Sequence, residues 1–258
     1  MRKIYTNHYI CFHQPRNMSD QNINIPEVSV DCVIFGFHAT DLKVLLLKVD
    51  DSEYWSLPMG SVSRKESLGM AASRVLEETT GIGNVFLQQF QTFGAVDRYK
   101  YYSKEQTKAV LESSKKEATE SLSYQSTISI GYYALVDFEK IAPPFKEYQW
   151  CAISEIPNLL FDHNDFVDMA LVALRKDLRY LPIAKLLPEK FTLREMQKLY
   201  ETILDREFDR RNFHKLLMRY EFLIKLPEKR KGGANKPPNL YKIDVEKYET
   251  ALQDGISY

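Results

Sequence analysis

The segment at residues 60–82, GSVSRKESLGMAASRVLEETTGI, is the part of the chain from which the rest is best interpreted. Its apolar residues recur at helical spacing, which predicts a loop that leads into one amphipathic helix. The residues predicted to form the buried stripe of this helix are Leu68, Ala72, Val75, Leu76 and Thr79. Gly81 stands where a cap glycine ends a helix. Arg74 and Glu78 are four residues apart, so they can pair across one helical turn.

The same segment resembles the Nudix box, the loop and helix that hold Mg²⁺ against a diphosphate. That pattern is a glycine, five residues, a glutamate, seven residues, and then Arg-Glu-apolar-any-Glu-Glu-any-Gly-apolar. The positions that match it in register are Gly60, Glu66, Arg74, Leu76, Glu78, Gly81 and Ile82. The resemblance implies a Nudix-like α/β/α sandwich with a mixed sheet.

Two positions depart from the pattern, because Val75 and Thr79 stand where the family has metal-binding glutamates. Mg²⁺ needs oxygen ligands in near-octahedral geometry, usually from carboxylates and substrate phosphates. Val75 has no side-chain oxygen, Thr79 has only a neutral hydroxyl, and Glu77 lies about 100° around the helix from Glu78. We therefore expect no catalytic residues, no metal site and no cofactor, and any residual Mg²⁺ binding would rest on Glu78 with Glu66 nearby. The alternative is a magnesium-dependent Nudix pyrophosphohydrolase of a nucleoside diphosphate derivative, with metal ligands from another loop.

The composition is that of a chain with cores for two modest domains. Of 258 residues, 44% are hydrophobic and 27% are charged, and the formal net charge of zero gives no sign of a polyanion partner for the chain as a whole. The cysteines Cys11, Cys32 and Cys151 are far apart without metal-type spacing, which favours reduced thiols in a cytosol. We expect a cytoplasmic protein, since no apolar run is long enough for a membrane span and no secretion signal is present.

The chain divides into a polar N-terminal arm at 1–27, a Nudix-like domain at 28–181 and a C-terminal domain at 182–258. Branched and aromatic runs predict strands at 28–37, 43–48, 85–93 and 127–137, and a helix at 158–179. Residues 99–126 are polar and are predicted to form an excursion over the cleft or an interface element. Residues 182–188 have the composition of a linker. His163 is a lone histidine without a second one at ligand spacing, so it is interpreted as a helix-start or packing residue and not as a zinc ligand.

The C-terminal domain shows the pattern of a winged helix, that is, helix, turn, helix and a two-stranded hairpin. Thr192 and Glu195 form a predicted capping box for the first helix, and Asp209 is the predicted cap of the second. The second helix has an apolar face of Phe213, Leu216, Leu217 and Tyr220, and an opposite face of Arg211, His214, Lys215, Met218 and Arg219. Strands are predicted at 222–226 and 240–243, with a basic turn at 229–233 between them.

This region is basic, because residues 206–242 hold eleven Lys and Arg against four Asp and Glu. In helix-turn-helix docking the second helix enters the major groove, and a basic wing contacts phosphates. The predicted DNA-binding residues are Arg210, Arg211, Asn212, His214, Lys215, Arg219, Lys229, Arg230 and Lys231. Two alternatives remain, namely a basic face that is only solvated and a winged helix that contacts protein instead of DNA.

A Nudix-like domain without its metal-binding glutamates, followed by a winged helix, resembles the Nudix-related transcriptional regulators. The matching segments are LLPEKFTLREMQKLYE at 186–201, DRRNF at 209–213 and FDH at 161–163. Within that family the chain resembles most the sugar-responsive branch typified by the arabinose regulators of gut bacteria. The resemblance implies a regulator and not an enzyme. It also implies a homodimer on a palindromic double-stranded DNA operator, controlled by a small-molecule effector.

The effector is expected to be a sugar, a sugar phosphate or an ADP-ribose-like molecule in the Nudix-like cleft. Asp97 and Arg98 follow the strand at 85–93, at a corner that lies near the ligand cleft in Nudix-like folds, although an ion pair closing a turn explains them equally well. Trp55 is predicted to be a core residue or to line the pocket. The predicted effector-binding residues are Asp31, Trp55, Glu66, Arg74, Glu78, Asp97 and Arg98.

Overall fold

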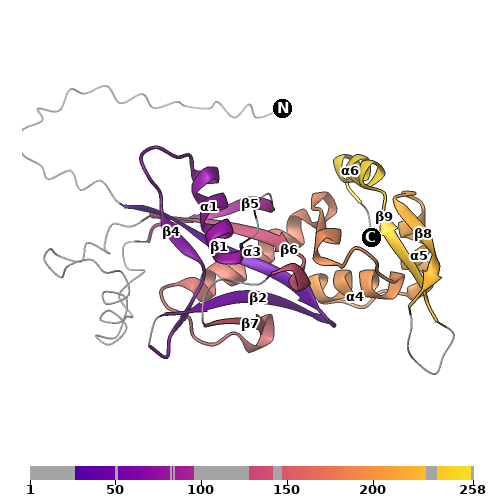
Figure 1. Cartoon of the computed structure of the whole chain (residues 1–258), viewed down its shortest axis with the longest axis horizontal. Coiled ribbons are helices and arrows are strands. Elements are labelled where there is room, and N and C mark those ends of the chain that lie inside the picture. The colour runs from indigo at the N-terminus through magenta and orange to yellow at the C-terminus, as the bar shows by residue number, and fades with distance from the viewer. Residues whose placement is uncertain are drawn as a thin grey trace, which may run out of the picture.

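The computed structural model describes residues 27–49, 52–81, 83, 85–95, 128–141, 147–230 and 237–256. A mixed seven-stranded sheet forms the first part of the molecule, and a smaller domain of helices with a two-stranded hairpin forms the second (Figure 1). The strands of the large sheet are β1 (Val28–His38), β2 (Asp41–Lys48), β3 (Trp55–Ser56), β4 (Met59–Ser61), β5 (Phe86–Phe93), β6 (Ile128–Val136) and β7 (Tyr148–Ala152). Cys11, Asp97, Arg98, Lys231 and the excursion at 99–126 lie outside the described residues.

The centre of the sheet is the parallel pair of β1 and β6, which runs in register from Val28↔Ile128 to Gly36↔Val136. The path of the sheet is β3-β2-β1-β6-β5, with β4 on β1 and β7 on β2. Both central strands are buried on both faces, which explains their almost continuous apolar sequences. Ser29 and Asp31 are polar exceptions in β1, and both are buried.

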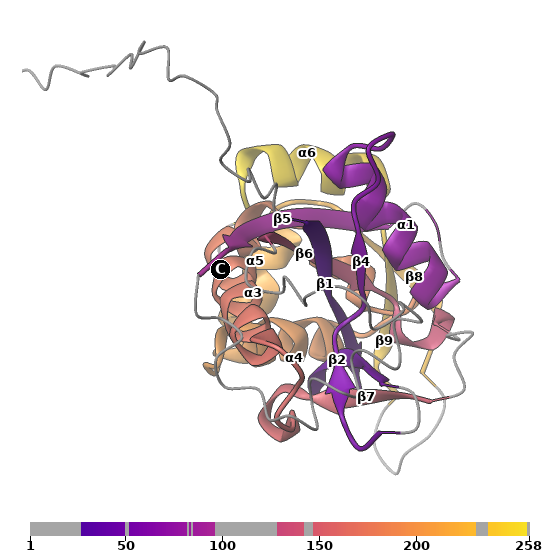
Figure 2. The ribbon, with the colours of Figure 1, turned by 90° about the vertical axis from the view of Figure 1, so that its left-hand side faces the viewer.

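Two helices cover opposite faces of this sheet (Figure 2). Helix α1 (Leu68–Thr80) packs on Val30, Cys32 and Ile34, whereas α3 (His163–Asp177) packs on the alternate residues of β1. This arrangement is the α/β/α sandwich that the Nudix box implied. The predicted buried stripe of α1 is confirmed except that Leu68 is only partly buried, and Gly81 ends the helix in the left-handed conformation with φ 72°.

The second domain is a winged helix, as predicted. Its elements are α4 (Leu193–Leu204), α5 (Arg210–Met218), β8 (Leu223–Lys229), β9 (Asn239–Ile243) and α6 (Val245–Asp254). The predicted capping box is confirmed, since the Thr192 N–H donates to Glu195 Oε2 at 2.6 Å and the Glu195 N–H donates to Thr192 Oγ1 at 3.2 Å. Asp209 caps α5 by accepting from the Asn212 N–H at 2.9 Å. Phe191 adds a short antiparallel bridge to Tyr241 of β9.

The segment predicted as a linker is part of the core. Four short 3₁₀ helices occur in the described chain: η2 (Phe138–Lys140), η3 (Ile153–Glu155), η4 (Leu178–Tyr180) and η5 (Ile183–Leu186). The last of these falls within 182–188, where Ile183 and Leu186 are fully buried. These residues do connect the two domains, but their burial in the core was not predicted.

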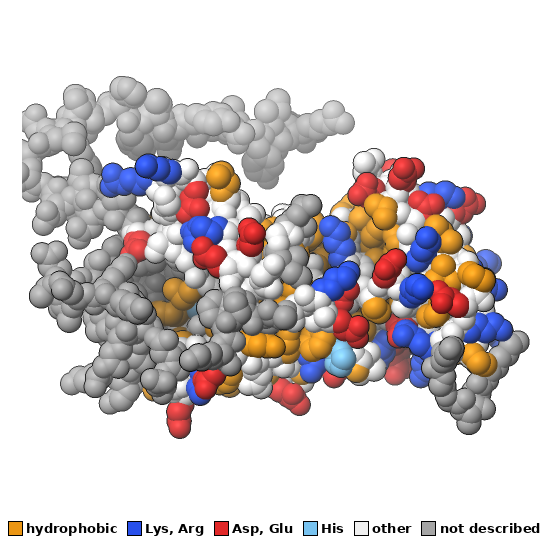
Figure 3. Space-filling view, in the orientation of Figure 1, with side chains coloured by type: hydrophobic (Ala, Val, Ile, Leu, Met, Phe, Trp, Pro, Cys, Tyr) orange, Lys and Arg blue, Asp and Glu red, His pale blue; other side chains and the backbone are white. Residues whose placement is uncertain are grey.

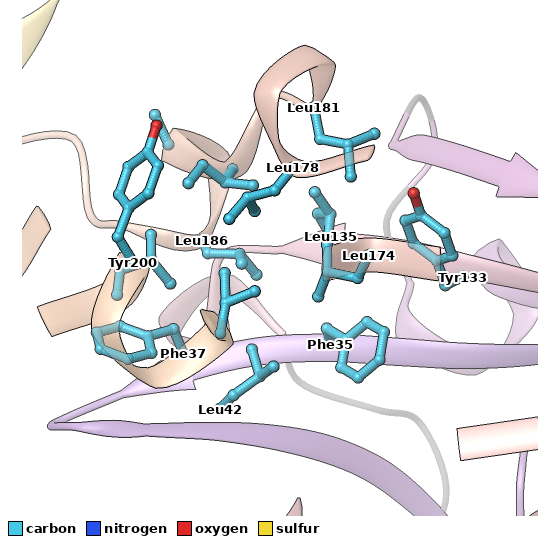
Figure 4. Packing of buried hydrophobic residues seen from close by; sticks show 14 of the residues in the cluster. Phe35, Phe37, Leu42, Tyr133, Leu135, Leu174, Leu178, Leu181, Leu186 and Tyr200 are labelled. Carbon is cyan, nitrogen blue, oxygen red and sulfur yellow. The ribbon is translucent and has the colours of Figure 1, made fainter. Parts of the chain in front are cut away.

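One apolar cluster therefore runs from the α3 face of the sheet, through η4 and η5, to Tyr200 of α4 (Figure 4). Polar bonds support the junction. Arg175 Nε of α3 donates to the Ile203 carbonyl of α4 at 2.6 Å, and Thr202 Oγ1 donates to the Thr40 carbonyl in the β1–β2 turn at 2.8 Å. The two parts are thus packed together through a shared core. Within the described ranges, no helix is both long enough and apolar enough to cross a membrane.

Candidate functional site

The side chain of Arg74 is the centre of the Nudix-box loop and helix. Its Nε and Nη2 donate to the two carboxylate oxygens of Glu66 at 3.1 and 2.9 Å, and its Nη1 lies 3.4 Å from Glu78 Oε2. The pairing of Arg74 with Glu78 across one turn is therefore confirmed. Hydrogen bonds from Arg74, and then from the backbone of Ser63, hold the pKa of Glu66 below its ordinary value. Both matching carboxylates of the box are thus held by one guanidinium.

The two departures from the Nudix pattern lie in the core. Val75 is 2% exposed in the cluster between α1 and the sheet, and a Cβ placed on Gly60 would lie 2.7 Å from Val75 Cγ2. Thr79 is 3% exposed, and its hydroxyl donates to the Val75 carbonyl at 2.6 Å. Neither side chain offers an oxygen to a ligand in the loop.

The donor set at this loop does not fit Mg²⁺ of the Nudix kind. A hard cation needs several oxygen ligands, and the two carboxylates here are already bonded to a permanently charged guanidinium. Within the part of the chain that the structure describes, no group of three or more His, Cys, Asp or Glu side chains is placed to hold a metal ion.

Asp31 is not exposed to a cleft, contrary to its expected role as an effector contact. It is 1% exposed, it accepts a hydrogen bond from Ser29 Oγ at 3.1 Å, and its Oδ1 lies 3.4 Å from Nε2 of His163. His163 is also 1% exposed, and its Nδ1 accepts from the Leu57 N–H at 3.0 Å. This second bond places the proton of a neutral imidazole on Nε2, facing Asp31. The pair connects β1 with α3, and the hydrogen bond from Leu57 connects α3 with the segment that precedes the Nudix-box loop.

His163 is the first residue of α3, so its interpretation as a helix-start and packing residue is confirmed. Its pairing with Asp31 was not predicted. Trp55 packs partly buried against the core, and its carbonyl accepts from the Leu160 N–H at 2.8 Å, as a core residue would. Whether it also contacts an effector stays a prediction, as it does for Glu66, Arg74 and Glu78.

The exposed face of α5 carries the predicted DNA-binding side chains. Arg210, Arg211, Asn212, Lys215 and Arg219 are all exposed, and so is Lys229 at the end of β8. Figure 3 shows Lys and Arg side chains on the winged helix, with Asp and Glu side chains between them. The one acidic group at the N-terminus of α5 is its cap residue Asp209, whose carboxylate faces the positive end of the helix dipole.

Two members of the predicted DNA-binding set are oriented differently. His214 is partly buried against the start of α4, and its Nε2 is buried without a hydrogen-bond partner among the described residues. Burial, and then the nearby charge of Arg210, lower the pKa of His214 despite a hydrogen bond with the Leu193 backbone. Arg230 pairs with both oxygens of Glu195, at 2.5 and 2.7 Å, and so supports the capping box of α4. The helical pattern placed His214 on the outer surface, and the basic turn placed Arg230 there, because neither pattern shows the neighbouring helix.

Fold and site together define a class of protein, a Nudix-like α/β domain joined to a C-terminal winged helix. Residues 183–243 match the NrtR DNA-binding winged helix domain. Over 245 residues the chain is 25% identical to the ADPR responsive transcriptional repressor NtrR of Acinetobacter baylyi, an alignment that covers 90% of this chain and 88% of that one. It is 28% identical over 159 residues to the RNA pyrophosphohydrolase of Pelagibacter ubique, covering 56% of this chain and 89% of that one.

Among solved structures, Shewanella oneidensis NrtR aligns with a TM-score of 0.65 at 25% identity, covering 85% of this chain and 95% of that one. These matches support the NrtR-type family of Nudix plus winged helix regulators. They do not support the expected kinship with the arabinose-type branch, since the similar regulator from Acinetobacter baylyi is ADPR responsive.

Proposed function

We propose that this chain is a DNA-binding transcriptional repressor whose Nudix-like domain senses ADP-ribose instead of hydrolysing it. The observation that carries this proposal is the contrast between the two sites. The Nudix-box carboxylates are held by Arg74, while the basic face of α5 has exposed cations without a covering element among the described residues. The similarity to an ADPR responsive repressor over most of both chains supports the same function.

On the DNA side, α5 enters the major groove with Arg211 and Lys215 toward base edges or phosphates. Lys229 on the hairpin contacts the backbone, which contributes affinity without reading sequence. The protein acts as a homodimer on a palindromic operator, so that two copies of α5 meet half-sites about one helical turn, or a multiple of it, apart.

On the effector side, ADP-ribose replaces the simple sugar expected from the arabinose branch, and it still contains a pentose. Its diphosphate carries negative charge that competes with Glu66 for the guanidinium of Arg74. Arg74 also donates to the Ser61 carbonyl at 3.0 Å, so its displacement moves the loop before α1. The effector acts only to the extent that it binds one arrangement of the protein more tightly than the other.

The decisive experiment measures binding of the purified protein to genomic DNA fragments at two salt concentrations, with and without ADP-ribose or arabinose. We expect sequence-selective binding that weakens with salt and that ADP-ribose, but not arabinose, changes. Arg211→Ala/Lys215→Ala should weaken operator binding by about 10-fold or more, since a side chain that reads a base edge contributes about 1–3 kcal/mol. The matched control Lys176→Ala/Lys185→Ala removes two exposed charges elsewhere and should leave binding unchanged. Full affinity in the α5 variant would refute the recognition-helix assignment.

The second candidate is a hydrolase, which the similarity to an RNA pyrophosphohydrolase favours. It predicts Mg²⁺-dependent release of product from a nucleoside diphosphate derivative. We expect no such turnover with ADP-ribose, because Val75 and Thr79 replace two metal-binding glutamates. Metal-dependent turnover that Glu78→Gln abolishes would support the hydrolase instead.

A further inference from the structure

A cavity of about 620 Å³ lies where the β1–β2 turn of the Nudix-like domain meets the winged helix. Ala39 and Thr40 of the turn form one wall of the cavity. Side chains of α4 form a second wall, and Arg210 of α5 and Arg230 after β8 form the remainder. The turn is held in place, since Thr202 of α4 donates to the Thr40 carbonyl at 2.8 Å. The cavity thus has walls from both domains and is within the size range of small-molecule sites, roughly 300–1,000 Å³.

The cations that line this cavity outnumber the acids. The cations are Arg194, Lys198, Arg210 and Arg230, and the acids are Glu195 and Glu201. Glu195 is bonded to Arg230 and to the Thr192 N–H. Glu201 accepts from Gln197 Nε2 at 2.9 Å and from the Phe208 N–H at 3.1 Å. Burial works to raise the pKa of Glu201, but these bonds, together with the charges of Lys198 and Arg194, outweigh it and hold that pKa below the ordinary value.

Two guanidinium groups of the cavity have no carboxylate at ion-pair distance among the described residues, although the charge of Arg194 acts on Glu201. Lys198 lies 3.8 Å from Glu201, whereas Arg194 and Arg210 form no ion pair within the described ranges. Arg210 is also the first residue of α5, beside the Asp209 carboxylate that caps the N-terminus of this helix. Paired guanidinium forks are the geometry that proteins use for phosphate.

We propose that this cavity binds a phosphate group, with Arg194 and Arg210 as its main contacts. The phosphate comes either from the operator backbone or from a free phosphorylated molecule, and the chemistry of the site is the same for both. Because Thr40 and Arg210 line the same space, a bound phosphate contacts the Nudix-like domain and the recognition helix together. Its lining contains no residue of the Nudix-box loop and comes from both domains.

The first test titrates the full chain with inorganic phosphate and pyrophosphate by calorimetry. Arg194→Gln/Arg210→Gln should bind these anions about 10-fold or more weakly than the wild type, because both substitutions remove charge-assisted hydrogen bonds to the anion. The matched variant Lys176→Gln/Lys185→Gln removes two exposed cations that do not line the cavity and should bind them as the wild type does. The same titrations in an Arg74→Gln background separate any anion binding at the Nudix-box loop. Equal binding by both double variants, or no binding by the Arg74→Gln protein, would overturn the proposal.

The second test identifies the source of the phosphate and rests on the proposed DNA binding. If the operator supplies it, Arg194→Gln reduces the slope of log affinity against log salt by about 0.9 for one phosphate, and pyrophosphate competes with DNA. If a free molecule supplies it, the slope stays unchanged while the anion titration is still weakened. A protein that binds no operator fails only this second test, so the proposed function and the phosphate site are judged separately. An unchanged slope together with an unchanged titration rejects the site.

Discussion

Asp31 and His163 meet inside the sandwich although they come from the first strand and from a helix late in the chain. The imidazole serves two partners, because Nδ1 accepts from Leu57 and Nε2 faces the carboxylate of Asp31. Ser29 links this pair to Ser129 of the parallel strand through a 2.7 Å contact between hydroxyls. A polar network of this kind stabilises the fold only while each member keeps its partners.

His163→Ala is therefore expected to destabilise the protein strongly. It leaves the Leu57 N–H and the Asp31 carboxylate buried without this partner, at a cost of about 1–3 kcal/mol for each group. Urea unfolding followed by fluorescence measures the decrease. Asp168→Ala, an exposed change on the same helix, is the control and should stay within about 0.5 kcal/mol of the wild type. Equal stability of the two variants would show that the network contributes little.

Restoring the Nudix glutamates should not restore a hydrolase. Val75→Glu/Thr79→Glu places two carboxylates at buried positions, where desolvation costs on the order of 3 kcal/mol or more. We expect a lower melting temperature and no Mg²⁺-dependent hydrolysis of ADP-ribose. Glu77→Gln, an exposed change on the same helix, should leave the melting temperature nearly unchanged. A stable double variant that hydrolyses ADP-ribose contradicts this prediction.

At the scale of elements, polar contacts as well as apolar packing hold α4 in place against its neighbours in the winged helix. Arg230 of the hairpin holds the cap residue Glu195 of α4, and His214 of α5 contacts the backbone at Leu193. His214, which the helical pattern assigns to the DNA face, thus helps to fix the recognition helix against its neighbour. The outer residues, Arg211 and Lys215 among them, are left for the operator.

The contact of His214 with α4 predicts a pH dependence of stability. The folded-state pKa of His214 is below its ordinary value of 6.5, so the unfolded chain takes up the proton first as the pH falls. The stability contributed by the neutral imidazole is complete above about pH 6.5 and is lost as the pH falls through the folded-state pKa. His214→Gln should flatten this part of the stability profile in thermal melts between pH 5 and 8. His38→Gln, a change at an exposed histidine, is the control, and an equal flattening there would argue against His214 as the source.

At the scale of the whole molecule, the two domains are packed against each other through one shared hydrophobic core. Leu186 of η5 is fully buried between the sheet and the helices of the second domain (Figure 4). A signal at the Nudix-box loop therefore reaches the winged helix through packed side chains, or through a change in how two such units assemble. Free rotation about a linker is not available to this chain.

We accordingly expect one cooperative unfolding transition. Leu186→Ala should destabilise the protein by about 2–5 kcal/mol without splitting that transition. Fluorescence of Trp55 and Trp150 reports the Nudix-like domain, and far-ultraviolet circular dichroism reports the helices of both domains. Lys185→Ala, at the exposed neighbour, should have little effect. Two separate transitions in the wild type would show that the domains unfold independently.

Local patterns in the sequence were sufficient to predict most of the helices and strands. The helix from Leu68 to Thr80, its glycine cap, the capping box at Thr192 and the hairpin all follow from the spacing of apolar residues and cap residues, which depends on neighbours a few positions away. Helix α6 was missed, although Asp244 as a cap and Tyr248 and Ala251 at helical spacing were available to predict it.

Tertiary contacts decided the remainder. The sequence determined that the chain has a Nudix-like box without two of its glutamates and a basic winged helix, because both are encoded in continuous segments. It did not determine that Asp31 is buried with His163, that residues 182–188 are core, or that Arg230 and His214 turn inward. Those outcomes depend on partners distant in the sequence, whose burial and hydrogen bonds exist only once the sheet, α3 and the winged helix have packed together.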